Sequence, residues 1–260
     1  MELGLQGKIA LVTGSSRGIG RGTALALAAE GCDVMLTGRD EKALEEVAAA
    51  IRAKGRRAAI TVLDLRENGA PEKLVAAVRR EFGGLDILFN NAGTTKRGDF
   101  FALTDADWEE GYALKFFAHV RLARAAWPLL KERHGSIIAI GGTGGRKPTE
   151  EFTIGSSVNA AVAAFSKCLA DRGKRDGVQV NCIHPSMVET DRLWRRIKAE
   201  MDRTGWPEQK AREEMCKAFG ITRFGKVDDV ADMIAFLVSS RGSWMHGATI
   251  DLDGGEIPTL

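Results

Sequence analysis

The sequence has 260 residues, of which 44 % are hydrophobic and 28 % charged, and its formal net charge is +2. This balance is typical of one globular domain, and without a basic block it argues against a nucleic-acid-binding protein. No apolar stretch reaches the roughly 20 residues that span a bilayer, and we see no targeting signal in the sequence, so we expect a cytoplasmic protein without a membrane partner. The four cysteines lack metal-ligand spacing, so we expect no metal site.

Short β-rich runs alternate with longer helical stretches along the chain. Strands are predicted at 8–13, 33–37, 58–63, 86–89, 136–140, 178–183 and 249–252. Helices are predicted at 20–30, 41–54, 71–82, 104–133, 156–172 and 228–238. This alternation predicts βαβ units, and hence an α/β Rossmann fold with a doubly wound parallel sheet of seven strands flanked by helices. We expect a single domain over 1–260, with the charged helical segment 191–219 as a substrate lid.

A glycine-rich segment, Thr13-Gly14-Ser15-Ser16-Arg17-Gly18-Ile19-Gly20, lies between the first predicted strand and the first helix. Glycines permit a tight turn and let the backbone approach a pyrophosphate, and the helix N-terminus supplies free N–H groups. The alternative is a glycine-rich turn without a ligand. The position at a strand–helix junction favours a dinucleotide site.

The end of the second predicted strand indicates which dinucleotide binds. It reads Leu36-Thr37-Gly38-Arg39, without the acid that would bind a ribose 2′-hydroxyl and repel a 2′-phosphate. Arg39 and Arg17 are suited to clamping a 2′-phosphate, since guanidinium groups present a flat fork of donors. The alternative is that both arginines are solvated surface residues. We expect NADP(H) to be favoured over NAD(H).

Several motifs resemble those of the classical short-chain dehydrogenase/reductase family. Besides the TGxxxGxG spacing of 13–20, they are Asp64, Asn90-Asn91-Ala92-Gly93, the segment His184–Thr190 and Asp251-Leu252-Asp253-Gly254-Gly255. The resemblance runs over essentially the whole chain and implies a homotetramer or homodimer joined by the helical segments 108–131 and 158–172. It implies cofactor contacts from Gly14, Ser16, Arg17, Gly18, Ile19, Gly20, Arg39, Asp64, Leu65, Asn91, Ala92, Gly93, Asn159, Pro185, Val188 and Thr190.

The catalytic positions of that family differ in this sequence. The family uses an Asn, a Ser and a Tyr-x-x-x-Lys motif. Ungapped comparison places Lys115 at the Asn, Gly142 at the Ser, Gly155 at the Tyr and Asn159 at the Lys. The only tyrosine of the chain, Tyr112, lies far upstream. A shift by one residue would offer the hydroxyl of Thr143 for the serine. A larger substrate, water, or a neighbour such as Phe152 could fill the room that Gly142 and Gly155 leave.

Lys115 and Asn159 exchange the family's lysine and asparagine, which suggests compensation. We hypothesise that Lys115 brings its ammonium near the usual lysine site, where Asn159 binds the ribose or Lys115 itself. A lysine among apolar helices can act as acid or base. Tyr112 and His119 flank it at helical spacing and are further candidates, with His184 a weaker one. The alternative is that Lys115 extends to solvent.

These observations predict an NAD(P)(H)-dependent oxidoreductase that acts on an alcohol or carbonyl group of a small organic substrate, with non-standard proton transfer. One alternative is a catalytically silent NADP(H)-binding homologue, acting as a sensor or scaffold. Another is non-redox chemistry such as dehydration or isomerisation. All depend on the analogy between fold and function.

Overall fold

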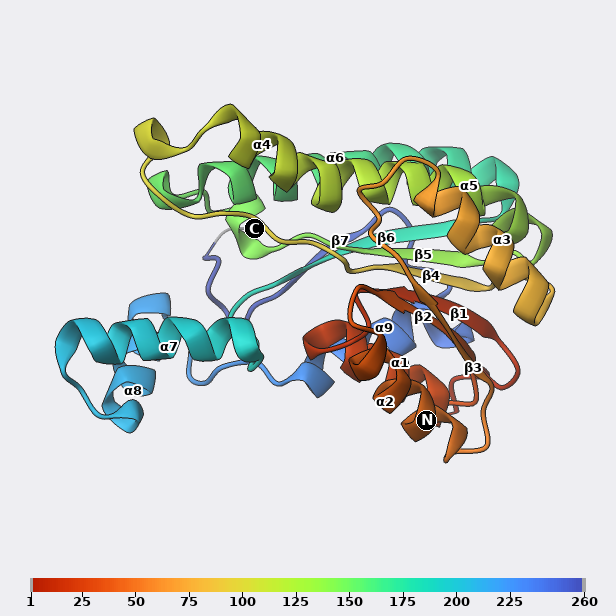
Figure 1. The fold of residues 1–260 in the computed structure, drawn as a ribbon, viewed down its shortest axis with the longest axis horizontal. Helices are drawn as coiled ribbons and strands as arrows, with labels where there is room; N and C mark the ends of the chain where they lie inside the picture. Colours follow the sequence, from red (N-terminus) through yellow and green to blue (C-terminus); the bar gives the residue numbers. More distant parts are fainter. Residues whose placement is uncertain (1, 259–260) are drawn as a thin grey trace.

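The computed structural model describes residues 2–258, and its centre is a parallel sheet with helices on both faces (Figure 1). The strand order is β3-β2-β1-β4-β5-β6-β7, and every neighbouring pair is parallel. The predicted seven-stranded, doubly wound Rossmann fold is confirmed. The strands are β1 (Ile9–Thr13), β2 (Asp33–Gly38), β3 (Ala58–Val62), β4 (Ile87–Asn90), β5 (Ser136–Ile140), β6 (Gln179–Pro185) and β7 (Thr249–Leu252).

The central strands are buried on both faces, which explains their apolar composition. All five residues of β1 and all four of β4 are buried, whereas β3 at the sheet edge is half-buried. A parallel strand covered by helices on both sides has no solvent face and therefore shows no alternation. The order of connections reverses at β1 and β4, and ligands of open α/β sheets bind in the crevice at such a switch point.

Two helical layers cover the sheet (Figure 1). One holds α1 (Gly18–Ala29), α2 (Glu41–Arg52) and α9 (Val227–Leu237). The other holds α3 (Ala70–Phe82), α4 (Asp105–Tyr112), α5 (Ala118–Glu132) and α6 (Thr153–Asp176). Separate hydrophobic clusters form the two layers, one around Leu27 and Val34 and one around Leu122 and Leu88. Short 3₁₀ turns occur at Phe100–Ala102, Thr143–Gly145, Glu150–Phe152 and Ser240–Gly242.

The long helix predicted over 104–133 is confirmed in extent, since the chain is helical from Asp105 to Glu132, but a π turn at Ala113–Phe117, which was not predicted, separates α4 from α5. A π turn adds one residue to a helical turn, changes the direction of the following side chains, and is frequent at functional sites. Lys115 lies in the middle of this turn and is buried. The residue that the family comparison singled out therefore has an unusual backbone setting.

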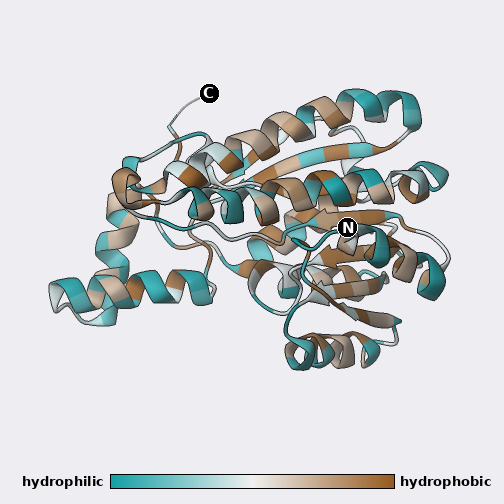
Figure 2. Ribbon diagram, turned by 45° about the horizontal axis from the view of Figure 1, so that its top comes forward, coloured by the Kyte–Doolittle hydropathy of each residue, from teal (hydrophilic) through white to brown (hydrophobic). Residues whose placement is uncertain are grey.

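The segment 191–219 consists of two helices, α7 (Asp191–Thr204) and α8 (Glu208–Phe219), that pack on one another. The chain turns between them at Gly205, whose φ is +71°. The pair has a small core of its own. Figures 1 and 2 show it projecting beside the sheet, with both hydrophilic and hydrophobic residues along its helices. None of the helices described between residues 2 and 258 combines the length and apolar character that crossing a bilayer demands.

Candidate cofactor and active site

The loop between β1 and α1 has the backbone geometry of an anion cradle. Gly14 and Gly18 have φ values of +62° and +55°, which favour glycine. A Cβ atom on Gly20 would lie 2.2 Å from the Gly14 carbonyl oxygen, so only glycine fits there. Helix α1 has no side-chain cap at Arg17, which leaves its first N–H groups available. The loop therefore suits a pyrophosphate, as predicted for a dinucleotide.

The end of β4 holds this loop in place. Asn91 Nδ2 donates to the Thr13 carbonyl oxygen at 2.9 Å and to the Gly14 carbonyl oxygen at 3.3 Å. Thr13 Oγ1 accepts from the backbone N–H groups of Asn91 and Ala92 at 2.9 and 3.0 Å. Two predicted cofactor contacts thus also brace the cradle. This bracing role was not expected from the sequence.

Three charged residues lie beside the ends of β2 and β3. Arg39 is exposed, and its Nη1 lies 3.7 Å from an Asp64 carboxylate oxygen. Asp64 accepts from Arg66 Nε at 3.0 Å and from Arg66 Nη2 at 2.6 Å, and this hydrogen bonding lowers the pKa of Asp64. Sequence reasoning missed Arg66, since the i, i+2 spacing of the pair in a loop carries no specific signal. Arg17, also exposed, completes a positive rim around the loop.

The remaining predicted cofactor residues are spread along the same crevice. Ile19 and Leu65 pack into the two hydrophobic clusters, so they offer mainly backbone to a ligand. The segment after Pro185 pairs Val188 with Gly225. The Thr190 methyl group would lie 3.3 Å from a Cβ on Gly18. The segment following β6 therefore borders the glycine loop. Ser16 lies near the end of β2, where its Oγ would be 3.8 Å from a Cβ on Gly38.

Lys115 is buried between the ends of β4 and β5. Its Nζ donates to the Gly141 carbonyl oxygen at 2.9 Å, just beyond β5. Its stem packs on Gly93, where an added Cβ would come within 3.0 Å of Lys115 Cγ. Burial, and to a smaller extent the positive charge of Arg192, lowers the pKa of Lys115 to about 7. A lysine with this pKa exchanges protons near neutral pH.

Asn159 lies on the other side of the same glycine pair. A Cβ on Gly142 would lie 2.8 Å from Asn159 Nδ2, so the amide fills the space next to that backbone. The buried Oδ1 of Asn159 has no hydrogen-bond partner among residues 2–258. Lys115 and Asn159 meet at Gly141 and Gly142, and Lys115 bonds to a backbone carbonyl rather than to the Asn159 side chain that the hypothesis also allowed.

Phe152 fills the room at the start of α6. A Cβ on Gly155 would lie 2.0 Å from Phe152 Cζ, and one on Gly144 would lie 2.8 Å from its Cδ1. The guanidinium of Arg97 lies 3.9 Å from the centre of the same ring, at cation–π distance. Sequence reasoning did not identify Arg97, because nothing in the local sequence connects it to Phe152.

The two candidate histidines are held uncharged. Burial lowers the pKa of His119 and of His184 to about 4, and the charge of Lys115 contributes in both cases. His184 Nδ1 accepts from the Gly142 N–H at 2.7 Å, and His119 Nε2 lies 3.2 Å from the Ala92 carbonyl oxygen. Both therefore hold backbone around Lys115.

Tyr112 packs in an aromatic row. Its ring stacks on Trp108 at 6.5 Å between centroids and meets Phe116 edge-on at 6.1 Å. It belongs to the apolar cluster around Ile154. Thr143 begins a 3₁₀ turn, and its carbonyl oxygen accepts from two following backbone N–H groups at 2.9 Å.

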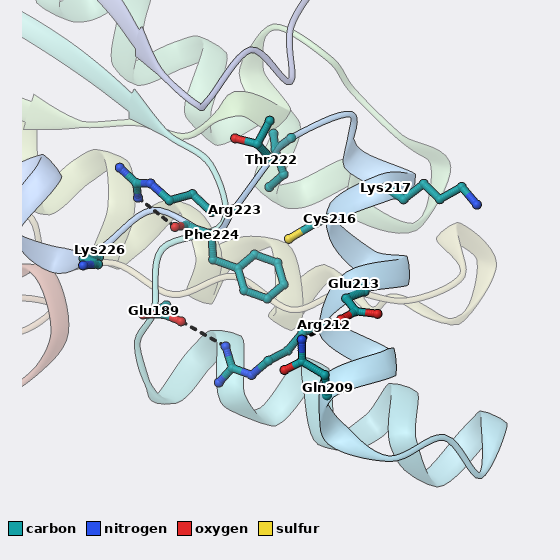
Figure 3. A pocket seen from close by; sticks show the side chains of 11 residues that line it. Glu189, Gln209, Arg212, Glu213, Cys216, Lys217, Thr222, Arg223, Phe224 and Lys226 are labelled. Atoms are coloured by element: carbon teal, nitrogen blue, oxygen red, sulfur yellow. Dashed lines mark hydrogen bonds and ion pairs between the residues drawn. The ribbon is translucent and has the colours of Figure 1, made fainter.

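A separate hollow of about 480 Å³ opens between α8 and residues 221–226 (Figure 3). An ion pair of 2.9 Å between Arg212 and Glu189 lies beside it, and the ring of Phe224 faces it. None of Lys115, Gly142, Gly155 and Asn159 lines this hollow. The chemistry-bearing groups are instead in the crevice at the carboxyl ends of β1, β4, β5 and β6.

Comparison with known proteins decides the family. A family model described as enoyl-(acyl carrier protein) reductase, a short-chain dehydrogenase model, matches residues 14–256. The chain belongs to the short-chain dehydrogenase/reductase family. It is 28 % identical to 2,3-dihydro-2,3-dihydroxybenzoate dehydrogenase of Bacillus subtilis (strain 168), over 97 % of each chain. It is 32 % identical to the 3-oxoacyl-[acyl-carrier-protein] reductase FabG of Escherichia coli (strain K12), over 97 % of this chain and 98 % of that one.

The fold comparison agrees with the sequence comparison. The structure of L-sorbose reductase from Gluconobacter frateurii, complexed with NADPH and L-sorbose, superposes with a TM-score of 0.96. The match covers 100 % of both chains at 32 % identity. All three relatives are oxidoreductases by name, so the predicted family resemblance is confirmed.

Proposed function

We propose that this short-chain dehydrogenase/reductase is an NADP(H)-dependent oxidoreductase that interconverts a carbonyl and an alcohol of a small organic substrate, with Lys115 as the proton-transferring group. One observation carries the proposal. Lys115 is buried in a π turn, and its Nζ donates to the carbonyl oxygen of Gly141, the residue before Gly142, which we place at the family's serine position.

The cofactor assignment is supported by the cradle and by charge. The glycine loop, the uncapped start of α1 and the bracing by Asn91 fit a pyrophosphate. Arg17 and Arg39 are exposed, and β2 ends in Leu36-Thr37-Gly38 followed by Arg39, without an acid at the strand end. A relative with the same fold, L-sorbose reductase, was solved with NADPH. These features favour NADP(H) over NAD(H).

The proposal treats the chain as a divergent member of its family. Gly142 stands at the serine position and Gly155 at the tyrosine position. The spaces are occupied: Asn159 fills the one beside Gly142, and Phe152 fills the one above Gly155. A repacked pocket of this kind argues for a changed proton-transfer group rather than for simple loss of side chains.

The nicotinamide, when bound, supplies or accepts the hydride. This chain's residues supply the rest. Lys115 Nζ uses one N–H for the Gly141 carbonyl and keeps two for a substrate oxygen. Its lowered pKa lets it donate a proton during reduction and accept one during oxidation near pH 7. The Gly142 N–H is held by His184, and Asn159 leaves its Oδ1 free to accept from a hydroxyl.

Two further assignments follow from the architecture. We assign α7 and α8 as a substrate lid within a single domain, since Arg192 on α7 reaches across to the Gly93 carbonyl oxygen at 2.9 Å. We also assign the outer face of α6 to a homo-oligomer interface. The small exposed residues Ala160, Ala164 and Cys168 follow one another there at helical spacing.

The experiment measures NADPH oxidation across a panel of ketones and aldehydes. We expect turnover of at least one substrate and its near-complete loss in Lys115→Ala, with NADPH fluorescence titration showing retained cofactor binding. Lys167→Ala is the matched control, because Lys167 also donates to a backbone carbonyl, that of Gly247 at 2.8 Å. Unchanged turnover in Lys115→Ala would contradict the proposal.

The absence of hydroxyl groups at Gly142 and Gly155 favours one second candidate, an NADP(H)-binding protein without turnover, acting as a sensor or scaffold. It predicts tight NADPH binding and no oxidation of NADPH with any substrate of the panel. The same titration and assay therefore separate the two functions.

A further inference from the structure

Three arginines from two separate segments border the Lys115 crevice without an acidic partner. Arg97 lies in the loop after β4, while Arg192 and Arg196 lie on α7. None of them takes part in the ion pairs found among residues 2–258. Arg97 lies on the Phe152 ring, and Arg192 donates to the Gly93 carbonyl oxygen. Arg196 Nη1 contacts Met187 Sδ, and its guanidinium lies 5.4 Å from the centre of the Phe219 ring on α8. Most other arginines near the crevice, such as Arg66 and Arg146, do pair with carboxylates.

These arginines also repel one another. Loss of hydration lowers the pKa of all three. Neighbouring positive charge contributes for Arg192, where Arg195 acts most strongly, and for Arg196, but not for Arg97. Arg97 acts on both Arg192 and Arg196, and Arg17 acts on Arg192. Only Glu151 and Glu256 oppose them, and Glu256 already accepts a hydrogen bond from Ser186. The mouth of the crevice therefore has surplus positive charge in the absence of a ligand.

The position of these groups distinguishes substrate from cofactor. Arg97 lies on Phe152, whose ring covers Gly155 and Gly144, the first of which we place at the family's tyrosine position. Arg196 Nη1 lies 3.0 Å from Met187 Sδ in the segment after β6. Arg192 holds Gly93, against which the Lys115 stem packs. Arg17, in contrast, belongs to the glycine loop, where cofactor phosphates are expected.

We propose that the substrate carries an anionic group, a carboxylate or a phosphate, that binds between Arg97 and Arg196 while its carbonyl faces Lys115. This inference rests on the proposed function and specifies its substrate class. Arg192 lies one helical turn before Arg196 on α7 and adds a third positive charge near the site. Phe152 positions Arg97 by stacking, which leaves the edge of the guanidinium and its donors free for two oxygens.

The same geometry explains why residue 155 is a glycine. Any side chain at this position would collide with the Phe152 ring, within about 2 Å of two of its atoms. Displacing that ring would remove the platform under Arg97. The missing bulk at Gly155 and the unpaired arginine are therefore parts of one arrangement.

The test compares matched aldehydes. We expect 4-carboxybenzaldehyde to be reduced with a kcat/KM at least about 100-fold above that of its neutral methyl ester, and L-sorbose to behave like the ester. Arg97→Ala and Arg196→Ala should each lower kcat/KM for the carboxylate by about 30-fold or more and change the ester by less than about twofold. Arg203→Ala on the same helix is the control, since Arg203 pairs with Glu200 at 2.6 Å.

A second experiment tests the anion site independently of the proposed oxidoreductase activity. Sodium benzoate, phenyl phosphate and inorganic phosphate are titrated into the NADPH complex and followed by nicotinamide fluorescence. Saturable binding that Arg97→Ala abolishes supports the anion site even if no aldehyde is reduced, and the stronger of benzoate and phenyl phosphate identifies the group. Equal rates for acid and ester, with no effect of Arg97→Ala, overturn the anion site and leave the oxidoreductase standing.

Discussion

The cofactor half and the catalytic half of the crevice differ in how closely they match the family's motifs. The cofactor half, from β1 to the loop after β4, keeps its motifs intact, because it binds through backbone N–H groups and needs glycines at exact positions. In the catalytic half, built from the π turn, the end of β5 and the start of α6, we propose that other side chains stand at the family's catalytic positions. Its spaces are refilled by Asn159 and Phe152. Recognition through backbone N–H groups leaves little freedom to substitute residues. A side chain that takes part in chemistry can be replaced where the neighbouring residues repack around the substitution.

The largest effect is expected from blocking the cradle. In Gly20→Val the new side chain would meet the Gly14 carbonyl oxygen and the Asn91 amide at the centre of the loop. We expect the Kd for NADPH to rise more than about 100-fold, since several phosphate contacts are lost together. Fluorescence titration measures it. Gly98→Ala, whose Cβ would meet nothing closer than 3.7 Å, is the control and should bind normally.

The next effect concerns pH. Because Lys115 has a pKa of about 7, it donates protons below this value and accepts them above it. The rate of carbonyl reduction should fall as pH rises through about 7, and the rate of alcohol oxidation should rise over the same range. Lys115→Ala should lose about 10³-fold in kcat and show neither transition. Identical pH profiles for the two proteins would assign proton transfer to another group.

A smaller effect is expected on stability. The folded pKa of Lys115 lies below its ordinary 10.5, so the unfolded chain binds more protons between about pH 7 and 10.5. Stability should therefore rise with pH over that interval, and below pH 7 the full cost of burying the charge is present. Lys115→Met should raise the free energy of unfolding by about 1–3 kcal/mol at pH 6 and by almost nothing at pH 10.5. Urea denaturation at both pH values measures it.

The smallest effect belongs to the exposed rim of the cofactor half. Arg39→Ala should weaken NADPH about tenfold and leave NADH unchanged, because only the former carries a 2′-phosphate. The difference should shrink at high salt, since Arg39 is solvent-exposed. Parallel titrations with both cofactors at two ionic strengths measure it. Equal weakening of NADPH and NADH would remove Arg39 from cofactor selection.

The sequence by itself determined the succession of strands and helices along the chain, the parallel sheet and the glycine cradle. Each depends on local signals: apolar runs such as Ile9–Thr13, alternation with helices, and glycines at a strand–helix junction. It also singled out Lys115 and Asn159, although only as an unusual exchange of residues.

Only the tertiary structure decided what surrounds them. The π turn at Ala113–Phe117, the pairing of Asp64 with Arg66 and the stack of Arg97 on Phe152 above Gly155 have no local signature. Residues 97 and 152 are distant in sequence and meet because separate loops end at the same edge of the sheet. Burial, which lowers the pKa of Lys115, likewise comes from packing of segments remote from one another.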